Sequence, residues 1–228
     1  MKIEKLYSAL ENITKNKDSI FKNSGMFNKF RTFDYGFFPL GLGLLSNDRR
    51  VGKLDEKNYK VMILGNDFGT LKYLKTCEDN KAEASSNSTI NNLLTKLNLA
   101  PNSTFYTNFH LGVRIQGTNT IREVELKENY KELCFKFFIK QLEIINPNIV
   151  ICLGHAVRLA LVESSSLFND WNYKNKSIKK FYESKTHKIE ISNNILGNRK
   201  FILSPHPCYS INFKQYYVDE IIRMIQYN

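Results

Sequence analysis

Long apolar runs, paired cysteines and internal repeats are all missing from this 228-residue sequence. No apolar run approaches the roughly 18 residues that a membrane span needs, so we expect a soluble protein without a membrane partner. The cysteines, Cys77, Cys134, Cys152 and Cys208, are widely spaced and include no Cys-x-x-Cys pair, which argues against a zinc site or an iron–sulfur cluster. Cys152 lies in an apolar run and is expected to be a small core residue. We therefore predict no metal and no cofactor.

A secretory signal is also missing from the first residues, Met1 to Tyr7, which lack a long apolar stretch and a small-residue cleavage site. We therefore expect a cytoplasmic location. With no low-complexity linker and a length that suits one α/β domain, residues 1–228 are predicted to form a single domain.

What the sequence does contain is an excess of basic residues and enough apolar residues for a core. The 42% hydrophobic and 13% aromatic content argues against a disordered chain. The formal net charge is +11, and excess Lys and Arg attract phosphate backbones. We expect a monomer whose partner is a nucleic acid. A diffuse positive surface is the alternative, because Lys, Asn and Ile are abundant throughout the chain.

Hydrophobic periodicity divides the chain into a lead-in and a core. Residues 1–58 are predicted to be helical or irregular, with Leu6, Leu10 and Ile13 at helical spacing. In the core, from about residue 60 to 217, short apolar or β-branched runs predict strands at 61–64, 104–106 and 201–203. Helices are predicted for residues 89–97, 130–145 and 213–227, and a strand pair for residues 187–191 and 200–203.

The segment from Trp171 to His187 combines many lysines with aromatic residues. This mixture is typical of contacts with single-stranded or distorted nucleic acid, but a solvated insertion is the interpretation that we favour.

Polar side chains follow three of the predicted strands. Asp67, Asn108 and His206 each come just after a strand pattern ends. In an open α/β sheet these strand ends converge on one crevice, where ligands bind. A carboxylate, an amide and an imidazole brought together there could activate water, read a base edge and stabilise a leaving group.

Motifs around these residues match a known pattern in order and spacing. They are Gly65-Asn66-Asp67-Phe68-Gly69-Thr70, Thr107 to Arg114, and His206 to Ile211, with Asn148 to Ala156 as a fourth piece. In this order they resemble the uracil-DNA glycosylase superfamily, over about residues 60–217. The resemblance implies an α/β fold, a three-layer α/β/α arrangement with a short, mainly parallel central sheet. It also implies a monofunctional DNA glycosylase that hydrolyses the N-glycosidic bond of a flipped-out pyrimidine and leaves an abasic site.

The resemblance assigns roles to individual residues. Asp67 would hold the attacking water and stabilise the sugar cation, and His206 would donate to the base O2 as negative charge grows there. Asn108 would read the N3–H and O4 of uracil. Further base contacts are implied for Asn66, Phe68 and Gly69, and contacts to DNA for Ser86, Ser88, Pro207, Tyr209, Ser210 and Ile211. The alternative for Asp67 and Asn108 is a turn residue, and for His206 a surface histidine.

Departures from the family pattern concern the substrate. Gly69 stands where the best-known branch has a tyrosine that crowds C5 of the base, so a 5-substituted pyrimidine is an alternative to uracil. Ser210 aligns with the family's wedge leucine. Phe68, Tyr73 or Phe109 could stack on the extruded base.

Two other functions stay open. One is a glycosylase that removes hypermodified cytosine, such as glycosylated hydroxymethylcytosine, from phage DNA as an antiviral defence. The other is a catalytically silent superfamily member that binds DNA or a protein.

Overall fold

A five-stranded sheet organises the part of the chain that the computed structural model describes. That part comprises residues 2–14, 27–28, 59–67, 92–99, 104–111, 113–114, 130–173, 177–206 and 215–226. The strands are β1 (Phe27–Asn28), β2 (Val61–Gly65), β3 (Thr104–Asn108), β4 (Val113–Arg114), β5 (Ile149–Leu153), β6 (Lys188–Asn193) and β7 (Gly197–Ser204). The helices are α1 (Lys2–Thr14), α6 (Tyr130–Ile145), α7 (Gly154–Ser164), α8 (Ile178–Glu183) and α9 (Gln215–Gln226), with a 3₁₀ helix, η5, at Ser166–Trp171.

The central sheet has the strand order β3-β2-β5-β7-β6, in which only β6 runs antiparallel. Every residue of β2 and β5 is buried, as parallel strands covered on both faces require. Successive residues of a strand point to opposite faces. Met62 and Leu64 therefore join the core on one face of the sheet, while Val61 and Ile63 join the core on the other.

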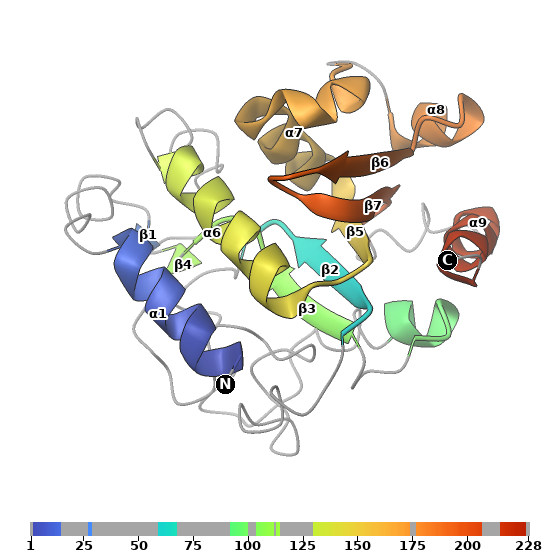
Figure 1. Cartoon of the computed structure of the whole chain (residues 1–228). Helices are drawn as coiled ribbons and strands as arrows, with labels where there is room; N and C mark the ends of the chain where they lie inside the picture. Colours follow the sequence, from blue (N-terminus) through green and yellow to red (C-terminus); the bar gives the residue numbers. More distant parts are fainter. Residues whose placement is uncertain are drawn as a thin grey trace.

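Helices cover both faces and complete the three layers that the sequence predicted. On one face α6, α7 and η5 pack against the sheet, and α1 lies on the outer side of α6 (Figure 1). On the other face lie α9 and the helical residues 92–96, through Leu93, Leu94, Val218 and Ile221. Cys152 is a fully buried core residue, as predicted, and burial raises the pKa of its thiol.

Most predicted elements of the core are confirmed, including the strand pair that precedes the last motif and the helix at residues 130–145. Two features differ from the prediction. The lead-in contributes a short strand, since β1 pairs antiparallel with β4. The segment from Trp171 to His187 is not a solvated insertion, because Trp171, Phe181 and Tyr182 are buried.

Within the described part of the chain, no helix is long and apolar enough to cross a membrane.

Candidate active site

Three of the residues singled out by the sequence lie along one edge of the sheet, where the four parallel strands have their carboxyl ends. Asp67 is two residues beyond β2, Asn108 is the last residue of β3, and His206 is two residues beyond β7. The chain runs from β2 outward to β3 and then crosses to β5 on the other side of β2. Such a reversal of strand order opens a crevice at the carboxyl ends, which is the usual place for a ligand in an open α/β sheet.

The carboxamide of Asn108 lies over Gly65, its partner in the register of β2 and β3. A Cβ atom built on Gly65 would be 2.1 Å from Asn108 Oδ1. Only a glycine leaves room for this side chain, and the backbone of Gly65 has an ordinary negative φ. The absence of a side chain at Gly65 thus leaves the space that the Asn108 amide occupies.

The chain beyond Asn108 stays hydrogen-bonded to the end of β2. The amide of Phe109 donates to Gly65 O and that of His110 to Asn66 O, each at 2.9 Å. The first turn of α6 holds the next residue, because the Tyr130 hydroxyl donates to Leu111 O at 2.5 Å. The Tyr130 ring also stacks on His110, with 6.0 Å between ring centroids. These buried contacts hold the backbone directly after Asn108 against β2 and α6.

Asn66 supports the carboxylate of its neighbour. Asn66 Nδ2 donates to Asp67 Oδ2 at 3.1 Å, which restricts the rotation of the Asp67 side chain. Asn66 Oδ1 is buried and has no hydrogen-bond partner among the described residues. Buried carbonyl oxygens are normally hydrogen-bonded, so this atom is an acceptor available to a donor that enters the site. Asn66 therefore has a supporting contact that its motif position did not reveal.

His206 packs on Gly154, the first residue of α7, at the end of the strand that separates β2 from β7. Gly154 has φ +85°, and a Cβ atom built there would be 3.2 Å from His206 Cβ. Burial lowers the pKa of His206, and the negative charge of Asp67 partly opposes this shift. The imidazole and the carboxylate therefore act on each other electrostatically across the end of β5.

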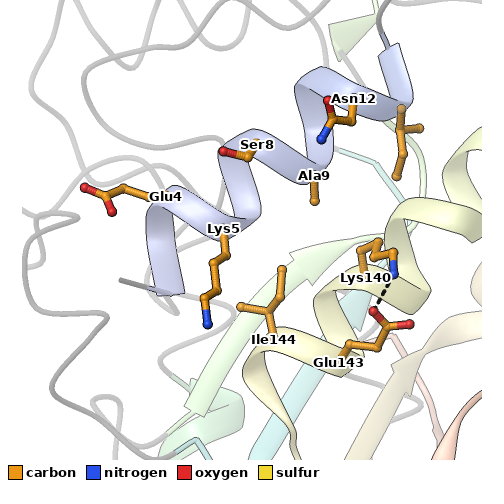
Figure 2. A pocket seen from close by; sticks show the side chains of 9 residues that line it. Glu4, Lys5, Ser8, Ala9, Asn12, Lys140, Glu143 and Ile144 are labelled. Atoms are coloured by element: carbon orange, nitrogen blue, oxygen red, sulfur yellow. Dashed lines mark hydrogen bonds and ion pairs between the residues drawn. The ribbon is translucent and has the colours of Figure 1, made fainter.

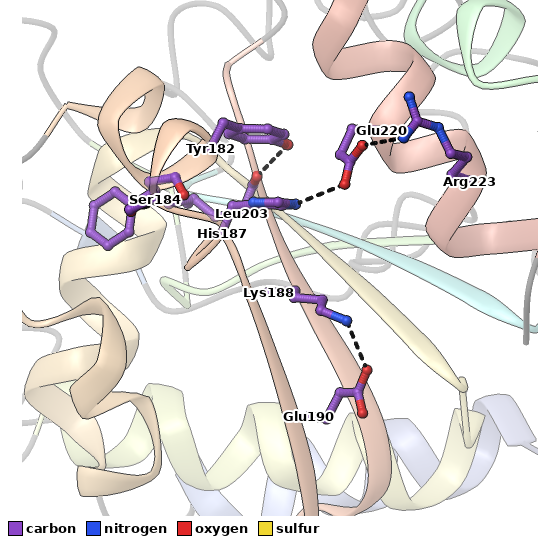
Figure 3. Close-up of polar contacts among 9 residues, drawn as sticks. Tyr182, Ser184, His187, Lys188, Glu190, Leu203, Glu220 and Arg223 are labelled. Atoms are coloured by element: carbon purple, nitrogen blue, oxygen red, sulfur yellow. Dashed lines mark hydrogen bonds and ion pairs between the residues drawn. The ribbon is translucent and has the colours of Figure 1, made fainter.

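Aromatic residues support the end of β7 just before His206. The Tyr182 hydroxyl donates to Leu203 O at 2.7 Å, and its ring stacks on His187 with 4.1 Å between centroids. His187 faces Glu220 of α9 (Figure 3), and His187 Nε2 lies 3.8 Å from Glu220 Oε1. Burial lowers the pKa of His187, although Glu220 opposes this shift. These contacts link β7 to α8 and α9.

A second polar pair at the same edge escaped the sequence analysis. His155, the exposed residue after Gly154, has its Nε2 atom 3.2 Å from Nη2 of the fully buried Arg158. A guanidinium only donates hydrogen bonds, so Nε2 must accept and the imidazole hydrogen must be on Nδ1. Arg158 Nη1 donates to the carbonyl oxygens of Trp171 and Tyr173. The spacing of His155 and Arg158, three residues apart in a helix that begins at Gly154, is the signal that could have identified this pair.

One of the predicted stacking residues is excluded by the fold. Phe109 is buried in the core against Phe138, with ring centroids 6.3 Å apart, so its ring is not available to an extruded base. The reason is the alternation along β3, which places residue 109 on the same face as Phe105. The other candidate residues Phe68, Gly69, Tyr73, Ser86, Ser88, Pro207, Tyr209, Ser210 and Ile211 lie outside the described residues.

An open groove of about 610 Å³ lies elsewhere, between α1 and the last turns of α6 (Figure 2). Its lining includes Lys5, Lys140 and Glu143, and the Lys140 ammonium donates to Glu143 at 2.6 Å. The last turns of α6 lead into the amino end of β5, so this groove is away from the carboxyl edge that carries Asp67 and His206.

A comparison of the sequence with models of known protein families finds no match, and a comparison with curated proteins finds no similar sequence.

Proposed function

We propose that this protein is a DNA glycosylase that hydrolyses the N-glycosidic bond of a flipped-out pyrimidine. The observation that carries the proposal is the joint position of Asp67 and His206, which influence each other across the end of β5. The motif resemblance to uracil-DNA glycosylases supports the same reaction, and so does the position of Asp67, Asn108 and His206 at the carboxyl ends of the parallel strands. The net charge of +11 suits a polyanionic substrate.

The two side chains supply the two kinds of stabilisation that this hydrolysis needs. When the bond between the sugar C1′ and the base nitrogen breaks, positive charge develops on the sugar and negative charge on the base. The Asp67 carboxylate faces the sugar, stabilises the cation and orients the water whose oxygen forms the new bond to C1′. The proton that this water loses passes to solvent or to the departing base anion.

His206 acts on the base. Burial lowers the pKa of His206, so its imidazole is neutral near pH 7 and keeps one N–H group that can donate to the base oxygen. A neutral donor that is already in position stabilises the developing anion without reorganisation of water. Gly154 is required beneath the ring, because any side chain there would push against His206.

Asn108 reads the pyrimidine edge. Its carboxamide offers one acceptor and two donors, and it lies over Gly65, where the absence of a side chain leaves room for it. A site that hydrogen-bonds a substrate in this way rejects bases that lack the matching groups, because its own polar atoms would be left without partners. Uracil and pyrimidines substituted at C5 present the same N3–H and O4 edge where both groups are kept.

The test is a base-release assay on single-stranded and duplex oligonucleotides that contain uracil, 5-hydroxymethylcytosine, its glucosylated form or thymine. Hot alkali then cleaves the strand at abasic sites. We expect Asp67→Asn and His206→Ala each to lower single-turnover release by about 10²–10³-fold, the usual cost of one catalytic group. DNA affinity is expected to stay unchanged, because both residues act in the transition state. The matched control is Asp170→Asn, an exposed carboxylate on η5.

Full activity in either variant would remove that residue from the mechanism. A wild-type protein that binds DNA but releases no base from any substrate would refute the glycosylase proposal and favour a silent DNA-binding protein.

A further inference from the structure

Beside the candidate active site lies an exposed surface made by Tyr173, Lys179, Lys180 and Lys185, on α8 and its flanks. We propose that this surface, the α8 surface, binds a single-stranded stretch of the DNA that carries the target nucleotide. The inference rests on the proposed function, since it concerns the strand that enters the same site.

Buried contacts connect the α8 surface to the catalytic edge. His206 packs on Gly154, and the next residue, His155, is hydrogen-bonded to Arg158 at 3.2 Å. The same guanidinium donates to Tyr173 O at 3.3 Å and lies over the Phe181 ring of α8, 5.3 Å from its centroid. One fully buried guanidinium thus joins the edge that carries His206 to the backbone of Tyr173.

The chain that follows α8 also lies close to the strand end that leads to His206. The chain leaves α8 at Glu183 and enters β6 at Lys188, which pairs with Ile202 near the carboxyl end of β7. The amide of Leu203 donates to His187 O at 2.8 Å, so the residues after α8 lie beside the strand end that leads to His206. Figure 1 shows α8 next to the ends of β6 and β7.

Tyr173 is exposed and yet held in place. Its side chain is 52% exposed, a large fraction for an aromatic residue. The amide of Tyr173 donates to Trp171 O at 2.9 Å, and its ring meets the buried Phe181 ring edge-on, with centroids 6.0 Å apart. A fixed aromatic ring that faces solvent can stack on a base with little loss of conformational entropy.

Exposed lysines lie on the helix whose Phe181 ring Tyr173 contacts. On α8 the buried side carries Phe181 and Tyr182, which leaves Lys179 and Lys180 on the exposed side. Residues 177–188 contain four lysines and one glutamate. The ion pair between Lys179 and Glu183, 3.4 Å long and exposed at both ends, is weak enough to give way to a phosphate.

An exposed aromatic ring on a lysine-rich surface fits a single strand better than a duplex. The bases of a duplex are already stacked on one another, so an external ring can stack only on an unpaired base, while lysines follow the backbone. The α8 surface therefore favours single-stranded or locally opened DNA over intact duplex.

The experiment measures the affinity of the full-length protein for a fluorescein-labelled single-stranded oligonucleotide by anisotropy, with a blunt duplex of the same sequence as comparison. Tyr173→Ala is expected to weaken single-strand binding by about 5- to 150-fold, the range for loss of one base–aromatic stack, and Tyr173→Phe to restore it. The double variant Lys179→Gln/Lys180→Gln is expected to lower the slope of log K against log salt by about 1.4. Duplex binding is expected to change less in each case.

Matched controls come from exposed residues away from this surface. Ile195→Ala removes a 59% exposed apolar side chain at the turn between β6 and β7, and Lys5→Gln/Lys136→Gln removes two exposed charges from α1 and α6. Unchanged single-strand affinity in Tyr173→Ala, or equal losses in these controls, would overturn the proposal. Binding is measured in the Asp67→Asn background, so the result does not depend on catalysis. Failure of base release would therefore count against the proposed function alone.

Discussion

Replacement of Gly154 by alanine tests the arrangement of the candidate active site more sharply than removal of a catalytic group. Gly154 has φ +85°, in the left-handed region that disfavours residues with a Cβ atom. The added methyl group would also be 3.2 Å from His206 Cβ and 3.6 Å from His206 Cδ2. A single methyl group thus strains the backbone and pushes on the imidazole.

The two effects have different expected sizes. Backbone strain of this kind costs about 1–2 kcal/mol. For a protein of this length, that loss lowers Tm by about 2–8 °C. The contact with His206 is a few tenths of an ångström shorter than ordinary van der Waals separation, so the ring must shift. Because a displacement of about 1 Å can cost about 10²-fold in rate, we expect single-turnover base release to fall by about 10- to 100-fold.

Gly197→Ala is the matched control for strain. Gly197 also has a positive φ, +68°, but it begins β7 at the opposite edge of the sheet, where a Cβ atom would meet Arg199 Nη1. Both variants are expected to lose stability in thermal unfolding, while only Gly154→Ala loses base release at a temperature where both are folded. Equal activity in the two variants would show that the packing of His206 on Gly154 does not matter for the reaction.

The remaining predictions concern base recognition and pH. Gly65→Ala is expected to keep the fold, because the added Cβ atom would clash, at 2.1 Å, only with the flexible end of the Asn108 side chain. The variant is expected to alter the substrate profile in the same direction as Asn108→Asp. An unchanged profile in both variants would make Asn108 a turn residue. His187 and His206 have pKa values lowered by burial from the ordinary 6.5, so the unfolded chain takes up protons first on acidification. The free energy of unfolding, measured in urea titrations, is thus expected to be highest above pH 6.5 and to decrease as the pH falls below 6.5. His187→Phe, which keeps a ring against Tyr182, is expected to make this decrease shallower. An identical dependence on pH would show that His187 does not contribute to it.

The sequence predicted the strands of the sheet because both faces of a parallel strand are buried. Such strands appear as short apolar runs, as at β2 and β5, and polar residues directly after them are then placed at the carboxyl edge. The two-residue pair of β1 and β4 could not be predicted, since two residues show no periodicity. The burial of Trp171, Phe181 and Tyr182 could not be predicted, because a 3₁₀ helix and a six-residue helix are too short to show a hydrophobic periodicity among many lysines.

Within the site, the sequence identified which residues end the strands but not what they touch. The contacts of Asn108 with Gly65 and of His206 with Gly154 depend on which strands are neighbours, and the sequence alone left that order open. The orientation of Phe109 was predictable from the alternation along β3, because residues 105 and 109 are separated by an even number. Its aromatic character suggested stacking on a base, whereas its place in the alternation favoured the core.

The antiparallel pairing of β6 with β7 bears on how the chain folds. A hairpin closes over a short loop, whereas each parallel pair must wait for a distant crossover. We therefore expect β6 and β7 to pair early, so that β7 has one set of its hydrogen bonds before β5 docks on its other side. Pulse-labelling hydrogen exchange during refolding would then show amides of the hairpin protected before those of β2 and β3; simultaneous protection would refute this order. β7, the last strand among the described residues and the one that leads to His206, would thus be among the first to take its final form.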